Sequence, residues 1–306
     1  MSATTNPPAP SPSTAQALIV CDNFIQGKYQ PSSSSNPYLP VISPVDGTQI
    51  GKVCISNAAD VDMAVACAQE AFPGWSGLTM KARASIMFRF QHLMETYAEE
   101  LAQLVVWENG KNIAEARASV AKGNETVEWA CGLPQMAQGK ILQVSRGVTC
   151  SDMREPIGVV ASVSPLNFPI MCPMWTIPIA LTAGNCVILK PSEKVPLTMH
   201  RVAALLHEAG VPPGVFQTVN GTAEAVNALV DHPGVAGTFC FGCVMLPFFI
   251  CMSLLLSLVQ SLPCSSCLHS GSSRTLLPPS FFLPRRDVCR VLSSGRACRQ
   301  SGKQVE

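Results

Sequence analysis

The alternation of short apolar runs with helix-like segments between Ile157 and Gly242 constrains the fold more than any other feature of the chain. Four runs are rich in β-branched or aromatic residues, and most of the segments between them have helical character. Strands that alternate with helices predict an α/β fold, in which right-handed crossovers join a parallel sheet flanked by helices. The four runs are IGVVASVSP, NCVILKP, FQTVNG and GTFCFG.

The ends of these runs predict where a ligand binds. All four end in Pro or Gly, and glycine lets the backbone approach a ligand closely. In open parallel sheets, ligands bind beyond the carboxyl ends of the strands. The fingerprint G-x-G-x-x-G does not occur, so glycine spacing gives no support for a standard Rossmann turn.

The N-terminal part predicts a hairpin followed by helices. Short apolar runs surround the turn dipeptide Asp46-Gly47 in the stretch 36–56, as in a hairpin. Apolar residues three and four apart in 57–75 predict a helix that ends at Pro73-Gly74. From Lys81 to Glu108 one apolar stripe predicts a single longer helix, and the stripe is interpreted as core.

Composition and charge exclude some classes of partner. With 306 residues, 47% hydrophobic and 13% charged, the chain can bury a full core. Residues 1–242 carry 14 Lys and Arg against 18 Asp and Glu, which argues against a nucleic-acid partner. The 14 cysteines, six of them after Gly242, are irregularly spaced and favour a reducing compartment over a disulfide scaffold.

The first 18 residues predict a disordered leader. They are rich in Ala, Pro, Ser and Thr, and the first basic residue of the chain is Lys28. A segment of this composition buries too little apolar surface to fold. Neither a signal peptide nor the Arg-bearing helix of a mitochondrial presequence is indicated.

Several motifs in a fixed order carry a resemblance to a known family. They are WENGK (107–111), VEWACGLPQMAQGK (127–140), REPIGVV (154–160), SPLNFPIMCPMW (164–175), GNCVILKPSEKVP (184–196), AGVPPGVFQTVNG (209–221) and FCFG (239–242). As a set they resemble the cofactor-binding half of the aldehyde dehydrogenase superfamily over residues 19–242, and most of all its CoA-acylating methylmalonate-semialdehyde dehydrogenase branch. The resemblance implies oxidation of a small-molecule aldehyde, with NAD as cofactor and CoA as co-substrate.

Asn167, an amide in an otherwise apolar stretch, is the catalytic residue that the resemblance implies. In the family a thiolate attacks the aldehyde carbon, and this asparagine donates a hydrogen bond to the oxygen as it becomes an oxyanion. A fixed donor in a dry pocket lowers the barrier by about 3 kcal/mol. The alternative is that Asn167 caps the next helix.

Trp175 lies eight residues after Asn167. On one continuous helix it would fall on the same face about two turns later. It is interpreted either as a wall of the aldehyde tunnel or as a core tryptophan.

The resemblance also implies a nucleotide site. Lys190 and Glu193 would hold the adenosine ribose, and the Glu193 carboxylate would repel a 2′-phosphate, which favours NAD over NADP. Backbone groups of Ser164 and Leu166 would line the nicotinamide side, and Lys194 would lie beside the adenosine. The alternative for Glu193 and Lys194 is a solvated helix start, where the helix dipole favours Glu.

The family pattern stops after Gly242. Cys243 stands where the family has a serine, and the catalytic domain with its nucleophilic cysteine is expected to be missing. The family implies a homo-oligomer, but its dimerising region is expected to be absent as well. It also implies a mitochondrial location, which the N-terminal residues do not support, so a cytoplasmic location stays open.

Residues 243–306 are interpreted as an unrelated tail of low charge, disordered or non-native. The stretch 240–262 is long enough for a membrane helix, but Pro247 interrupts it and no basic residue flanks it, so a membrane span is not favoured. The stretch 276–284 can be encoded by pyrimidine-rich codons, and we hypothesise that a retained intron encodes the start of the tail. If every spliced transcript continued from Gly242 into the tail, this hypothesis would be wrong.

The cysteines of the tail receive no role. Cys298 lies in GRAC, three residues after Gly295, but no helix or charge pattern there indicates a lowered pKa. The pair in CSSC at 264–267 lacks a second pair to complete a metal site, and no metal site is predicted. Two functions therefore remain: an NAD-dependent, CoA-acylating aldehyde dehydrogenase, or a catalytically inactive fragment that at most binds dinucleotide.

Overall fold

The described part of the chain covers residues 18–34, 38–146 and 148–240 of the computed structural model. The predictions for the leader up to residue 17 and for the tail lie outside these residues. The helices are α1 (Ala58–Ser76), α2 (Met80–Thr96), α3 (Ala98–Asn109), α4 (Ile113–Cys131), α5 (Leu133–Met136), α6 (Met171–Ala183), α7 (Leu197–Glu208) and α8 (Ala223–Asp231). The strands are β1 (Ile19–Cys21), β2 (Asn23–Ile25), β3 (Lys28–Gln30), β4 (Tyr38–Ile42), β5 (Gln49–Cys54), β6 (Lys140–Ser145), β7 (Val148–Asp152), β8 (Val159–Val163), β9 (Cys186–Lys190), β10 (Phe216–Thr218) and β11 (Gly237–Cys240).

The four predicted runs form the parallel core of one sheet. The strand order is β11-β8-β9-β10-β2-β3, and the first four of these strands run parallel to one another. Every residue of β9 is buried, as expected for a strand covered on both faces. The predicted α/β fold with a parallel sheet is confirmed for these strands.

The sheet is extended by two antiparallel strands that the sequence did not predict. β2 pairs antiparallel with β10, and β3 pairs antiparallel with β2. The buried Asn23 side chain fixes this junction, because its Oδ1 accepts the backbone N–H of Asn220 at 2.8 Å. A contact across almost 200 residues leaves no local signal in the sequence.

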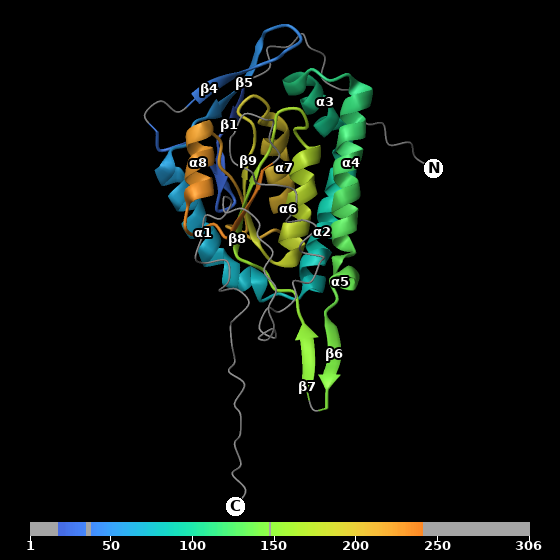
Figure 1. Cartoon of the computed structure of the whole chain (residues 1–306). Coiled ribbons are helices and arrows are strands. Elements are labelled where there is room, and N and C mark those ends of the chain that lie inside the picture. The colour runs from blue at the N-terminus through green and yellow to red at the C-terminus, as the bar shows by residue number, and fades with distance from the viewer. Residues whose placement is uncertain (1–17, 35–37, 147, 241–306) are drawn as a thin grey trace, which may run out of the picture. The chain divides into compact units, whose positions relative to one another are not determined.

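Helices cover both faces of the sheet (Figure 1). α1 and α8 pack on one face, and α6 and α7 pack on the other. α2 and α4 lie outside α6 as a further layer. Most of the predicted stripe is core: Phe90, Leu101 and Val105 are fully buried.

The predicted end of the first helix at Pro73 is wrong. α1 continues through Pro73 to Ser76, with Gly77 as its C-cap. The reason is tertiary: the Trp75 side chain is buried, and its indole N–H donates to the Leu181 carbonyl at 3.0 Å. This packing stabilises a last helical turn that a proline would otherwise disfavour.

The predicted single helix over 81–108 is also wrong. It consists of α2 and α3, which are separated at Tyr97, where φ is −100° and ψ is 16°. The break places the Tyr97 ring 4.6 Å from the guanidinium carbon of Arg201 in α7. The apolar stripe does not indicate such a break, because apolar residues recur at helical spacing in both α2 and α3 and are buried in both.

Two smaller sheets complete the described part. β4 and β5 form the predicted hairpin around Asp46 and Gly47, and β1 joins it parallel to β5. β6 and β7 form an exposed ribbon that projects from the helices (Figure 1). Among the described residues no helix has the length and apolar content needed to cross a membrane, and the stretch 241–262 lies outside them.

Candidate functional site

The carboxyl ends of β8 and β9 bring Ser164 and Lys190 together. In the register Val163 is opposite Lys190, and the Ser164 N–H donates to the Lys190 carbonyl at 3.1 Å. The pairing therefore continues one residue beyond β8. Both residues lie at the edge of the sheet where ligands of parallel α/β proteins bind.

Lys190 and Glu193 form an ion pair at this edge. Lys190 Nζ lies 3.0 Å from Glu193 Oε2, and the two side chains are 6% and 33% exposed. Burial acts to raise the pKa of Glu193, but the charges of Lys190 and Lys194 and the hydrogen bonds to the carboxylate together outweigh burial, so the pKa is lowered. Glu193 is therefore a carboxylate at neutral pH that still reaches solvent, and it can accept a hydrogen bond from a ligand. Lys194 is exposed.

Asn167 lies on the loop between β8 and α6, three residues after Ser164. Its Cα can be at most about 11 Å from that of Ser164. The Asn167 side chain is exposed, and its amide makes no hydrogen bond with the residues that the structure describes. Within the described residues the Asn167 side chain thus faces outward, although its neighbours Leu166 and Phe168 are held by other parts of the chain. Its role as a hydrogen-bond donor to an oxyanion stays a prediction.

The structure corrects two alternative interpretations: that Asn167 caps the next helix, and that Trp175 is a core residue. Asn167 does not cap this helix, because Ile170 is its N-cap and no side chain caps it. The continuous helix from Asn167 to Trp175 is also wrong, since α6 begins only at Met171. Trp175 is 38% exposed, so it is not a core tryptophan.

Three residues of the WENGK motif hold the two connections at this edge, which are the β8–α6 loop and the β9–α7 connection. No sequence pattern predicted a role for these residues. The Asn109 amide donates to the Leu166 carbonyl at 2.8 Å, and Lys111 Nζ lies 4.0 Å from the centroid of the Phe168 ring. Glu108 is 3% exposed and accepts hydrogen bonds from the first residues of α7. The only local signal for Glu108 was a charged residue at the end of an apolar stripe.

The protonation of Glu108 is expected to make folding stability depend on pH. Burial raises its pKa to about 7, although hydrogen bonds from Thr198 and Leu197 act to lower it. The folded chain then keeps a proton that the unfolded chain releases at about pH 4.3. This contribution to stability is complete below about pH 4.3 and is lost as the pH rises through about 7.

Urea unfolding of the parent and of Glu108→Gln at about pH 5 and about pH 8 measures this effect. The parent is expected to lose about 2 to 3 kcal/mol relative to the variant over that range. His200, whose pKa burial lowers to about 4, acts in the opposite direction in both proteins and cancels in the difference. If the difference in unfolding free energy between the parent and Glu108→Gln is the same at both pH values, the prediction is wrong.

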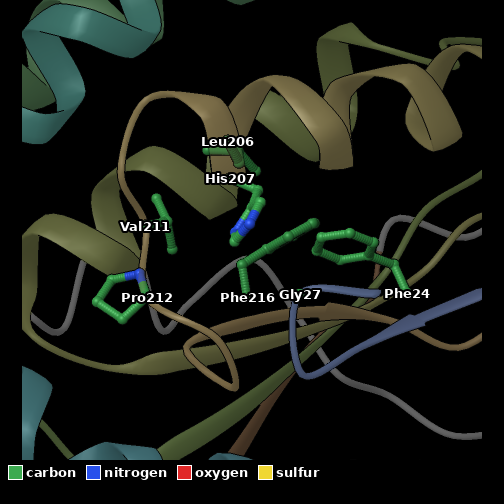
Figure 2. A pocket seen from close by; sticks show the side chains of 7 residues that line it. All are labelled: Phe24, Gly27, Leu206, His207, Val211, Pro212 and Phe216. Carbon is green, nitrogen blue, oxygen red and sulfur yellow. The ribbon is translucent and has the colours of Figure 1, made fainter. Parts of the chain in front are cut away.

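A crevice on the described residues lies away from this site. It lies at the amino end of β10, between the end of α7 and the turn after β2 (Figure 2). Inside it, Phe24 and His207 pack edge to face with ring centroids 6.1 Å apart. The crevice is therefore not where the predicted site residues meet.

Together, the parallel sheet and the polar groups at its carboxyl edge define an α/β domain of the class whose ligands bind beyond the strand ends. The model of the aldehyde dehydrogenase family matches residues 29–243, and the chain belongs to this family.

Known proteins of the family resemble the chain over most of its length. Malonate-semialdehyde dehydrogenase 1 of Geobacillus kaustophilus (strain HTA426) is 43% identical over 223 residues, which are 72% of this chain and 46% of that protein. The crystal structure of methylmalonate-semialdehyde dehydrogenase (DddC) from Oceanimonas doudoroffii is similar with a TM-score of 0.70 and 36% identity, over 72% of this chain and 45% of that one. A putative methylmalonate-semialdehyde dehydrogenase from Sinorhizobium meliloti 1021, complexed with NAD, has a TM-score of 0.70 and 33% identity over the same shares. The chain thus spans less than half the length of these relatives.

Proposed function

We propose that residues 19–242 are the NAD-binding half of a CoA-acylating aldehyde dehydrogenase that acts on malonate or methylmalonate semialdehyde. The observation that carries this proposal is the Lys190–Glu193 ion pair beside Ser164 at the carboxyl edge of the sheet. The names of the similar proteins support the substrate class, and the NAD complex of one of them supports the cofactor.

The residues present fit a dinucleotide. The Glu193 carboxylate is partly exposed and can accept hydrogen bonds from the two ribose hydroxyls, while its charge disfavours a 2′-phosphate. Lys190 holds this carboxylate in place. NAD, when bound, accepts the hydride from the substrate. The Asn167 amide would donate to the aldehyde oxygen as negative charge develops there.

A second proposal is that this chain binds dinucleotide but does not catalyse oxidation of the aldehyde. Burial raises the pKa of most of the described thiols, so none of these is a ready nucleophile. These thiols are Cys21, Cys54, Cys67, Cys131, Cys172, Cys186 and Cys240.

One assay separates the two proposals. The purified 306-residue chain is incubated with malonate semialdehyde, NAD and CoA, and NADH formation is followed by absorbance. Turnover supports the enzyme, whereas NAD binding without turnover supports the inactive fragment. A chain that binds no NAD would contradict both.

Glu193→Gln is expected to lower the preference for NAD over NADP by about tenfold or more. The change removes the charge that repels a 2′-phosphate and frees the Lys190 ammonium to attract one. The dissociation constants of NADH and NADPH, measured by fluorescence titration, give the ratio directly. Glu224→Gln is the matched control, since Glu224 is exposed in the first turn of α8. An unchanged ratio would mean that Glu193 does not face the ribose.

A further inference from the structure

Glu108 holds the end of the connection that carries the nucleotide-binding pair. This connection runs from Lys190, the last residue of β9, to Leu197, the first residue of α7. The Glu108 carboxylate accepts the backbone N–H of Leu197 at 2.6 Å and that of Thr198 at 3.2 Å. It also accepts the Thr198 hydroxyl. A nearly inaccessible carboxylate with these bonds fixes where the connection ends.

The next residues hold the loop that carries Asn167. The Asn109 amide donates to the carbonyl of Leu166 at 2.8 Å, and the Lys111 ammonium lies over the Phe168 ring at 4.0 Å. Leu166 and Phe168 are the two neighbours of Asn167. The loop is therefore held on both sides of Asn167, and the Asn167 amide itself stays available.

The segment 108–111 is itself rigidly placed. Gly110 ends α3 in the left-handed region with φ of 76°, and a Cβ there would lie 2.8 Å from Pro44 Cγ. Asn112 then caps α4 by accepting from the Glu115 N–H at 2.8 Å. The segment thus consists of the last residues of α3 and the start of its link to α4, and it has little freedom.

We infer that the segment 108–111 sets the position of Asn167 relative to the Lys190–Glu193 pair. Glu108 is a positioning residue for the adenosine side, and Asn109 is a positioning residue for the aldehyde and nicotinamide side. The inference rests on the proposed function. It follows from the geometry, because one short segment bonds to both connections at the carboxyl edge, and reaction rates are sensitive to displacements of about 1 Å between reacting groups.

Nucleotide titrations of the 306-residue chain test the two roles separately. AMP carries only the adenosine half of NAD. Glu108→Gln is expected to weaken AMP and NAD binding by the same factor, about three- to tenfold. Asn109→Ala is expected to weaken NAD binding by a similar factor but to leave AMP binding unchanged. A general loss of structure would not produce this split.

Two further variants control the titrations. Glu99→Gln makes the same substitution on α3 at a side chain that is 62% exposed, and no change in either affinity is expected. Thr198→Val removes the hydroxyl that bonds to Glu108 but keeps both backbone bonds. It is expected to act like Glu108→Gln with a smaller effect, which keeps the test valid if Glu108→Gln does not fold. Equal losses of AMP and NAD binding in Asn109→Ala would overturn the inference.

Amide hydrogen exchange tests the inference without any nucleotide. Glu108→Gln is expected to speed exchange within 191–198, and Asn109→Ala within 166–168, while Glu99→Gln changes neither. If the parent binds neither NAD nor AMP, the proposed function fails, but the exchange pattern still decides the inference. Unchanged exchange in both segments, or an increase spread over the whole chain, would overturn it.

Discussion

Replacing Asn167 with alanine is expected to lower aldehyde-dependent NADH formation about a hundredfold, because it removes a fixed hydrogen-bond donor to the oxyanion. The affinity for NAD is expected to change less than about twofold, since the Asn167 amide makes no hydrogen bond with the described residues and its removal leaves the ribose-binding pair intact. The measurements are kcat with saturating semialdehyde and CoA, and NAD titration of the same preparations.

Asn227→Ala is the matched control for this prediction. Asn227 is exposed on α8, and it also makes no hydrogen bond with the part of the chain that the structure describes. Its replacement is expected to leave both kcat and NAD affinity unchanged. If the kcat of Asn167→Ala is close to that of the parent, Asn167 does not stabilise the oxyanion. A parent that binds NAD but produces no NADH would instead support the inactive fragment.

Arg83→Met is expected to reduce the free energy of unfolding by about 3 to 5 kcal/mol. Arg83 is 4% exposed, and its guanidinium donates to Thr182 O at 2.9 Å, to Ser76 O at 3.2 Å and also to Trp75 O and Leu78 O. These carbonyls lie at or just after the ends of α1 and α6, where a cation also meets the negative end of each helix dipole. Methionine fills similar space but leaves the carbonyls without these donors.

Urea unfolding of the 306-residue chain, followed by circular dichroism, measures this loss of stability. Arg117→Met is the control, because Arg117 pairs with Glu99 on the surface with its side chain 58% exposed. Exposed ion pairs contribute at most about 1 kcal/mol, so a small effect is expected. Equal losses of unfolding free energy in the two variants would show that the buried Arg83 guanidinium stabilises the fold no more than the exposed Arg117 does.

The parallel core of the fold could be predicted because its strands are short, buried and β-branched. In β9 the run Cys186–Lys190 is apolar up to the lysine, and the proline that follows ends it. The helix boundaries could not be predicted in the same way. The continuation of α1 past Pro73 depends on Trp75 and Leu181, which are 106 residues apart. At the break between α2 and α3, the Tyr97 ring contacts Arg201 of α7, which is far away in the sequence.

The candidate site shows the same division. Lys190 and Glu193 are three residues apart, so their ion pair follows from the local path of the chain. Ser164 joins them because parallel strands end at the same edge. Asn109 and Leu166 are 57 residues apart, and Glu108 and Leu197 are 89 apart. No periodicity within either segment could indicate these bonds.

Local sequence specified the chemical groups of the candidate site and the parallel strands that carry them, and its motifs carried the resemblance to the aldehyde dehydrogenase family. These depend on side-chain type and on short-range backbone preferences, which local residues specify. Three features emerge only in the folded chain: Asn167 is exposed on a loop, it does not cap α6, and the segment 108–111 bonds to both connections. The physical reason is that burial and hydrogen bonding between distant segments depend on which surfaces meet after folding.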